Sequence, residues 1–197
     1  MNNALINLEN YDCIQKFKEN ALIDREIYVS IINKECIKIP LKNKESYAAT
    51  KSEINFYKKL EINEIKKYFS KPIRKVMTPK GTGFTYELIT DYDNSISKTL
   101  KYYLKKKIYI PNLVNEYNYL INMLKNNNMS FEKRFHTNNI VVQMISFSKY
   151  RLVIIDYELV LFSKKPIQFL NSDINLFIDY NKFFDTKKSL NNKVKLD

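Results

Sequence analysis

Glycine is the residue that most limits what this chain can fold into, because the 197 residues include only Gly81 and Gly83. Glycine adopts positive φ angles without steric cost and lets a backbone approach a ligand closely. Walker A phosphate loops, dinucleotide-binding GxGxxG loops and the nucleophile elbow of hydrolases all require glycines at fixed spacings. None of these motifs occurs in the sequence, so the function classes that depend on them are excluded.

Composition and cysteine content indicate a globular protein of a reducing compartment. Hydrophobic residues make up 45% of the chain and charged residues 27%, which suffices for a core at this length. The only cysteines, Cys13 and Cys36, lack the spacing of zinc ligands or of a disulfide framework. The N-terminus has no basic stretch followed by an apolar one, and no apolar run approaches the roughly 18 residues of a membrane span. We therefore expect a cytoplasmic protein that is neither secreted nor membrane-spanning.

The chain is strongly basic, with 33 Lys and Arg against 21 Asp and Glu and a net charge of +12. Such a charge is compatible with two interpretations, a solvated basic surface or a surface for an anionic partner such as a membrane. The lysines are scattered, with denser groups at Lys105–Lys107, at Lys164 and Lys165, and in the tail after Lys182. Because they are scattered, we do not expect a nucleic-acid partner.

The pattern of residues predicts two halves. The first half starts with a β-hairpin of residues 28–32 and 36–40, which are rich in β-branched residues, followed by a helix over 44–61. Strands over 73–78 and 84–90 flank the glycine turn, and Asp91–Asn94 is the expected connector. The second half is expected to contain a helix over 112–125, strands over 140–144 and 152–155, and a helix over 174–184.

Four polar residues stand in apolar surroundings or at strand ends: Lys38, Glu53, Asn139 and Asp156. Lys38 is either buried against a carboxylate or lies on the solvent-exposed face of an edge strand. If Lys38 is buried, Glu53 on the following helix could supply the carboxylate. Glu53 itself could face solvent. Asn139 and Asp156 begin and end neighbouring strands, where they could hold Mg²⁺ through oxygen atoms or act only as turn and cap residues.

Several stretches carry a resemblance to a known family. Residues 81–93 read GTGFTYELITDYD and are followed by Ser97, Thr99 and Leu100, and residues 36–39 read CIKI. With Glu53, Asn139 and Asp156 in this order, the chain resembles the protein-kinase-like fold, and more specifically the PhoP regulatory network protein YrbL family, over roughly residues 20 to 160.

The resemblance implies an α+β fold of the reduced protein-kinase-like, two-lobed kind. Residues 1–92 would form an N-lobe of antiparallel sheet and one helix, and residues 93–197 a short, mostly helical C-lobe with a metal-site hairpin and a basic tail. The implied cofactors are ATP and Mg²⁺.

The resemblance also implies roles for single residues. Lys38 would contact the α and β phosphates and be steadied by Glu53, while Asn139 and Asp156 would hold the metal. The nucleotide would further meet three residues at the end of the second sheet hairpin, where Glu87 and Ile89 lead to the adenine-binding hinge and Asp91 lies in it.

The sequence departs from an active kinase at the catalytic base. The position five residues before Asn139 is Arg134, which cannot accept a hydroxyl proton but could steady a developing charge. His136 is another candidate for catalysis, with a phosphate-contacting or simply exposed histidine as the alternative, and Glu132 is the nearest carboxylate that could replace the missing base.

Two further departures concern the phosphate-covering loop and the C-terminus. The loop, expected near residues 22–29, contains no glycine. Only 197 − 156 = 41 residues follow Asp156, too few for an activation segment with the usual substrate-binding helices.

These features favour a nucleotide-binding regulatory pseudokinase with little or no phosphotransfer. The alternative is an active phosphotransferase on a sugar or an anionic envelope glycolipid, with contact to the membrane periphery. A third hypothesis makes the basic surface itself the function, as an adaptor for nucleic acid or a membrane. The sequence leaves open whether the protein is an enzyme. It also leaves the protein partner open.

Overall fold

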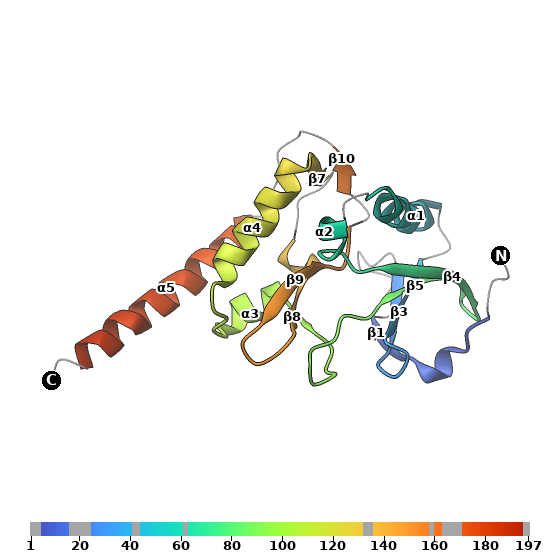
Figure 1. Ribbon diagram of the computed structural model, residues 1–197. Coiled ribbons are helices and arrows are strands. Elements are labelled where there is room, and N and C mark those ends of the chain that lie inside the picture. The colour runs from blue at the N-terminus through green and yellow to red at the C-terminus, as the bar shows by residue number, and fades with distance from the viewer. Residues whose placement is uncertain are drawn as a thin grey trace.

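The computed structural model shows an α+β chain of two lobes, with a sheet and its helix at one end and a largely helical half at the other (Figure 1). Long helix α5 (Asn171–Val194) extends away from the second half. The structure describes residues 5–15, 25–40, 44–60, 63–131, 136–157, 160–162 and 171–194.

The first half is built on a five-stranded antiparallel sheet in the order β1-β2-β3-β5-β4. The strands are β1 (Asp12–Gln15), β2 (Arg25–Ser30), β3 (Glu35–Pro40), β4 (Pro72–Thr78) and β5 (Gly81–Glu87). The predicted hairpin, now β2 and β3, and the predicted strand β4 are confirmed. β1 was not predicted, because its four residues show no alternating pattern. The expected phosphate-covering loop is wrong for residues 25–29, which belong to β2.

β5 ends at Glu87, whereas the alternating pattern predicts a strand up to residue 90. The reason lies in the neighbouring strand, because Glu87 pairs with Glu35, the first residue of β3. The Leu88 amide then donates to the Lys34 carbonyl in the preceding turn, at 3.0 Å. With no further partner in the ladder, the chain leaves the sheet at Leu88.

Both glycines have a structural reason. Gly81 closes the β4–β5 turn with a φ of +121°, a backbone angle that residues with a side chain rarely adopt. A Cβ on Gly83 would lie 3.0 Å from Cγ2 of Ile37, so a side chain at this position would require the buried Ile37 side chain to shift.

The two faces of the sheet are covered differently. One face buries Ile6, Tyr28, Ile37, Ile39 and Val76 beneath the N-terminal segment, which includes the 3-10 turn η1 (Leu8–Asn10). The other face meets helix α1 (Lys44–Lys59), which confirms the helix predicted there. Because side chains alternate along a strand, Lys38 lies on the α1 face while its neighbours Ile37 and Ile39 face the other way.

The second half combines helices with two small sheets, a three-stranded sheet β6-β8-β9 and the pair β10-β7. Helices α4 (Leu113–Asn126) and α5 and strands β8 (Ile140–Met144) and β9 (Tyr150–Ile154) confirm predicted elements, although α5 is longer than expected. The remaining elements were not predicted: α2 (Asn63–Lys66), β6 (Lys98–Thr99), α3 (Leu100–Lys106), β7 (Met129–Phe131), the 3-10 turn η2 (Thr137–Asn139) and β10 (Val160–Phe162).

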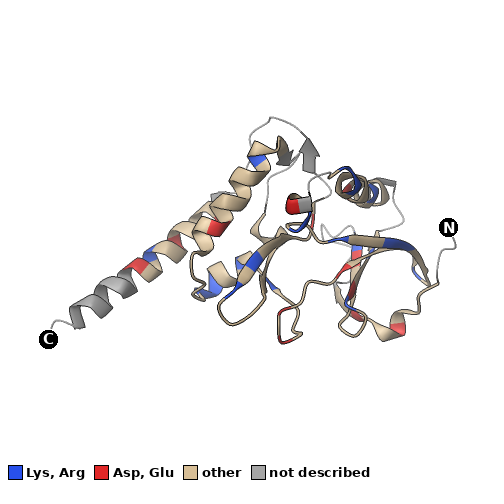
Figure 2. Ribbon diagram, in the orientation of Figure 1, with Lys and Arg blue, Asp and Glu red and all other residues tan. Residues whose placement is uncertain are grey.

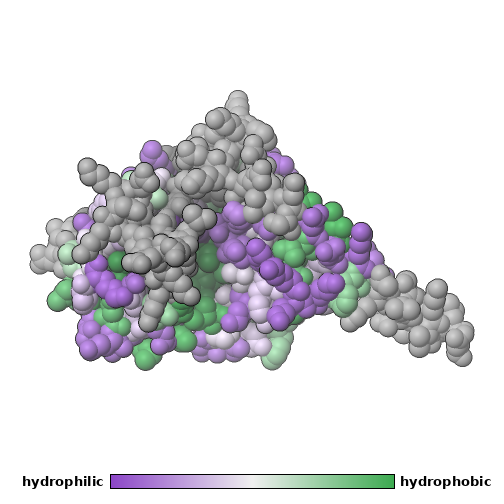
Figure 3. Space-filling model, turned by 180° about the vertical axis from the view of Figure 1, so that it is seen from behind, coloured by the Kyte–Doolittle hydropathy of each residue, from purple (hydrophilic) through white to green (hydrophobic). Residues whose placement is uncertain are grey.

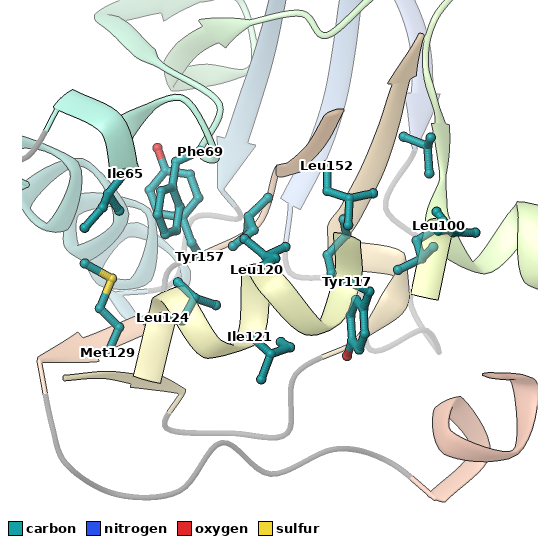
Figure 4. Close-up of a cluster of buried hydrophobic side chains, with 14 of the residues drawn as sticks. Ile65, Phe69, Leu100, Tyr117, Leu120, Ile121, Leu124, Met129, Leu152 and Tyr157 are labelled. Carbon is teal, nitrogen blue, oxygen red and sulfur yellow. The ribbon is translucent and has the colours of Figure 1, made fainter. Parts of the chain in front are cut away.

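The main hydrophobic core lies where the two halves meet (Figure 4). Leu120 and Leu124 of α4 are fully buried, and the same cluster includes Phe69 and Tyr157. The cluster also contains Phe56 of α1, so residues from both predicted lobes share one core. The boundary between residues 92 and 93 stays a prediction.

Charge and hydropathy are distributed without one dominant patch among the described residues. Lys and Arg occur on α1, β4, α3 and β9, with acidic residues between them (Figure 2). Seen from behind, hydrophobic surface lies between two hydrophilic regions in the middle of the molecule (Figure 3). None of the described helices is long and apolar enough to cross a membrane.

Candidate functional site

A buried ion pair joins the sheet to α1. Nζ of Lys38 lies 2.8 Å and 3.0 Å from the two carboxylate oxygens of Glu53. Lys38 is 5% exposed and Glu53 is 0% exposed. The alternatives of a lysine on a wet edge strand and a solvent-facing Glu53 are therefore wrong, because β3 is an interior strand between β2 and β5 and α1 covers its face.

The Glu53 carboxylate has two hydrogen-bond donors in addition to its ion pair with Lys38. It accepts hydrogen bonds from both the Lys38 ammonium and the Tyr86 hydroxyl, the latter at 2.8 Å. It also accepts one from the backbone N–H of Tyr157, at 3.1 Å. A buried carboxylate needs such partners, because an unpaired buried charge costs several kcal/mol.

Lys38 connects the two halves of the molecule directly. Its ammonium donates to the backbone carbonyl of Ile155 at 2.8 Å and lies 4.4 Å from the centre of the Tyr86 ring. Ile155 immediately precedes Asp156. Lys38 of the first sheet thus contacts the residue next to Asp156, and the two residues converge as the sequence predicts.

Two tyrosines of this site were not identified as functional residues from the sequence. Burial, reinforced by the Glu53 charge, raises the pKa of Tyr86 far above its ordinary value, so the hydroxyl remains a donor. Burial raises the pKa of Tyr157 as well, and its hydroxyl donates to the Ser70 carbonyl at 2.6 Å. The only signal for Tyr86 was its place in the GTG-containing stretch that carries the family resemblance.

Asn139 directly precedes β8, and Asp156 lies two residues after the end of β9. The Ile155 N–H donates to the Asn139 carbonyl at 2.8 Å, which extends the β8–β9 ladder to the residue before Asp156. The side chain of Asp156 is 38% exposed, and its Oδ1 atom lies 3.8 Å from Nη1 of Arg25. Within the described residues, Oδ1 is buried and accepts no hydrogen bond.

This donor set fits Mg²⁺. The ion prefers hard oxygen ligands, keeps several waters and is often held by one or two protein oxygens together with substrate phosphates. Asp156 supplies a carboxylate oxygen that needs a cation, and Asn139 supplies an amide oxygen. Among the described residues, no group of three or more His, Cys, Asp or Glu side chains is placed to hold a metal ion.

The three residues expected at the adenine hinge occupy different environments. Glu87 is exposed at the end of β5, and Ile89 is buried against Val141 and Val153. The Asp91 carboxylate accepts hydrogen bonds from the Ser97 hydroxyl and the Met144 N–H, so it holds the connector against β8. In this arrangement, Asp91 positions the connector through its Oδ1 atom, which accepts both hydrogen bonds.

The catalytic-loop residues are only partly described. Arg134 and Glu132 lie outside the described residues, and nothing tests their predicted roles. His136 is half-buried, and its carbonyl accepts a hydrogen bond from the Asn139 N–H at 3.0 Å. The backbone of His136, three residues before Asn139, is therefore in direct contact with the backbone of Asn139.

Asp173 supports this loop and was missed by sequence reasoning. It lies in the first turn of α5, is 2% exposed, and accepts a hydrogen bond from the Thr137 N–H at 2.7 Å. The contact fixes η2, which ends at Asn139. Its one sequence signal was an aspartate at the start of an apolar helix, a pattern that ordinarily indicates a helix cap.

Comparison with known proteins agrees with this architecture. The family described as PhoP regulatory network protein YrbL matches residues 23–164, which is most of the chain. The chain belongs to this family. No curated protein matches the sequence.

Solved structures similar to this YrbL-family chain have the kinase fold. The bifunctional kinase-methyltransferase WbdD matches with a TM-score of 0.53 and 12% identity, over 86% of this chain and 37% of WbdD. WbdD in complex with the kinase inhibitor LY294002 matches with a TM-score of 0.52 and 13% identity, over 87% of this chain and 38% of WbdD. The YrbL-family chain thus spans less than two fifths of these proteins, and the likeness shows the kinase-like two-lobed fold predicted from the sequence.

Proposed function

We propose that this YrbL-family protein binds a purine nucleotide between its two halves and acts as a regulatory pseudokinase with little or no phosphotransfer. The observation that supports this most is the buried Lys38–Glu53 pair, whose ammonium also contacts the carbonyl next to Asp156. Phosphate recognition requires a fixed cation beside oxygen atoms that can share a metal. Burial and the hydrogen bonds of Glu53 fix that cation in place.

Each residue has a distinct part in this proposal. Lys38 binds phosphate oxygens and Glu53 positions Lys38, while Asp156 and Asn139 hold Mg²⁺, which when bound neutralises the charge of the phosphates. Ile89 and the connector after β5 border the base. ATP is the nucleotide we propose, as the family resemblance implies.

Weak phosphotransfer follows from the chemistry of the base position. Arg134 stands where kinases have an aspartate, and a guanidinium cannot take the proton from an attacking hydroxyl. Nucleotide binding without turnover would make the occupancy of the site, rather than a product, the regulatory signal.

Thermal unfolding with ATP and Mg²⁺ tests nucleotide binding. We expect ATP to raise the melting temperature of the wild type, and to have little effect on Lys38→Met/Glu53→Leu, which removes both charges together so that no buried charge is left unpaired. Lys58→Gln is a matched control, since it removes one exposed charge from the same helix, α1. No shift in the wild type, or an equal shift in the double variant, would falsify the proposal.

A second candidate function is phosphotransfer to a sugar or an envelope glycolipid precursor at the membrane periphery. His136 favours it, because its backbone contacts that of Asn139 and its side chain is of a type that serves as a general base. The bifunctional kinase-methyltransferase WbdD has a similar fold. ATP turnover stimulated by such an acceptor and lost in both His136→Gln and Asp156→Asn would support this candidate, whereas absent turnover across an acceptor panel would exclude it.

A further inference from the structure

A second cation, Arg25, lies on the same face of the sheet as Lys38. In the β2–β3 ladder, Arg25 pairs with Pro40 and Ile27 pairs with Lys38. Paired residues of antiparallel strands share a face, and side chains two residues apart in a strand do so as well. The Arg25 side chain therefore projects on the Lys38 side, one step further along the sheet.

Arg25 is buried and lies close to Asp156. Its side chain is 6% exposed, and Nη1 lies 3.8 Å from Oδ1 of Asp156, the oxygen proposed above as a metal ligand. The positive charge of Arg25 also acts on Tyr86, whose pKa it shifts downward against the larger effect of burial. Arg25 thus belongs to the same charged cluster as Lys38, Glu53 and Asp156.

The contacts of the two acids in this cluster differ. Glu53 is saturated, because it lies within hydrogen-bond distance of Lys38, Tyr86 and the Tyr157 amide. Asp156 has an ion pair at 3.8 Å, too long for a hydrogen bond, and its buried Oδ1 accepts none from the described residues. An incoming anion or cation can therefore break the Arg25–Asp156 contact at a lower cost in free energy than the contacts of Glu53.

The chemistry of arginine suits a phosphate ligand. A guanidinium stays charged at any accessible pH and offers a planar fork of donors that matches phosphate oxygens. A phosphate loop usually supplies backbone N–H groups and relies on glycine for close approach. This chain has no glycine between residues 22 and 29, so side-chain donors at the start of β2 are the available replacement.

We propose that Arg25 binds the nucleotide phosphates and takes the place of a divalent metal at Asp156, so that nucleotide binding does not require the metal. This inference rests on the proposed nucleotide site. Arg25 and Mg²⁺ are alternatives at the same carboxylate oxygen, because each supplies the positive charge that this buried atom needs. A metal then adds little to the affinity, and in its absence the Asp156 carboxylate competes with the phosphates for Arg25.

Isothermal titration with ATP, in EDTA and in Mg²⁺, tests the inference on the full chain. We expect the wild-type dissociation constant in EDTA to lie within about threefold of that in Mg²⁺. Arg25→Gln should weaken binding in EDTA by about tenfold or more, the usual effect of losing a charge-assisted hydrogen bond. Lys58→Gln, which also removes one positive charge, should bind like the wild type in both buffers. Binding that vanishes in EDTA, or an Arg25→Gln protein that behaves like Lys58→Gln, overturns the inference.

Asp156→Asn provides a second test, because it should not weaken ATP binding in EDTA as Arg25→Gln does. In EDTA it should bind ATP at least as tightly as the wild type, because the acid that competes for Arg25 is gone. An affinity loss in EDTA as large as that of Arg25→Gln contradicts the inference. Binding that occurs only with Mg²⁺ contradicts the role of Arg25 but is compatible with the proposed function. A folded wild type, shown by a cooperative melting transition, that binds ATP in neither buffer refutes both.

Discussion

The backbone N–H of Tyr157 donates to the carboxylate of Glu53 across 104 residues of sequence, at 3.1 Å. Through this bond, α1 of the first half is held against the segment that follows β9 of the second half. Glu53 also binds Lys38, whose ammonium contacts the carbonyl of Ile155. The charged cluster therefore links α1 to the segment that borders the proposed nucleotide site.

We expect Glu53→Gln to destabilise the protein by about 3–5 kcal/mol, because it leaves Lys38 buried without its counterion. Chemical denaturation measures this change. Combining it with Lys38→Met should recover a large part of the loss, since the lone charge is then gone. Additive losses in the double variant would show that the two side chains do not interact.

Tyr86→Phe removes the hydroxyl that donates to Glu53 while keeping the ring beside Lys38. We expect a loss of about 1–3 kcal/mol in unfolding free energy, as for a buried acceptor that loses a donor. Tyr92→Phe is the matched control, because Tyr92 is exposed, and it should change stability by less than about 0.5 kcal/mol. Equal effects of the two substitutions would rule out the importance of the Tyr86 hydroxyl.

Stability should fall in alkaline solution partly through Cys36. Burial raises the pKa of the Cys36 thiol from 9.0 to about 11, an effect that Lys38 opposes and Glu53 reinforces. Because the folded state holds this proton more tightly, the thiol stabilises the fold below pH 9 and loses that contribution as the pH rises towards 11. Between pH 8 and 10, the wild type should lose about 1 kcal/mol more unfolding free energy than Cys36→Ala does. Parallel pH profiles of the two proteins would contradict this assignment.

Asp173 should control the order of the turn that carries Asn139. Asp173→Ala removes the acceptor of the Thr137 N–H, and we expect the Thr137 amide to exchange its hydrogen faster, with a stability loss of about 1–3 kcal/mol. Asp179→Ala changes an exposed residue of the same helix and should leave both quantities unchanged. Unaltered exchange at Thr137 in Asp173→Ala would mean that the hydrogen bond does not hold the turn.

Much of the fold could be predicted from local patterns. The periodicity of 3.6 residues in α1 and α4 and the β-branched residues of β2, β3, β8 and β9 identify these elements, because each element must bury one face. The short elements, such as α3 and β1, escaped prediction, since their few residues carry too weak a pattern. The order of Lys38, Glu53, Asn139 and Asp156, together with the stretch of residues 81–93, indicated the family.

The sequence by itself therefore determined the main secondary structure, the family and the four residues around which the site is proposed. Only the tertiary structure decided that β3 is an interior strand, so that Lys38 is buried, and that Arg25 and Asp173 approach Asp156 and Thr137. The physical reason is that burial and charge pairing depend on neighbours from distant parts of the chain. Hydrophobic periodicity reports which face of an element is covered, but it does not report which charged side chain lies across from it.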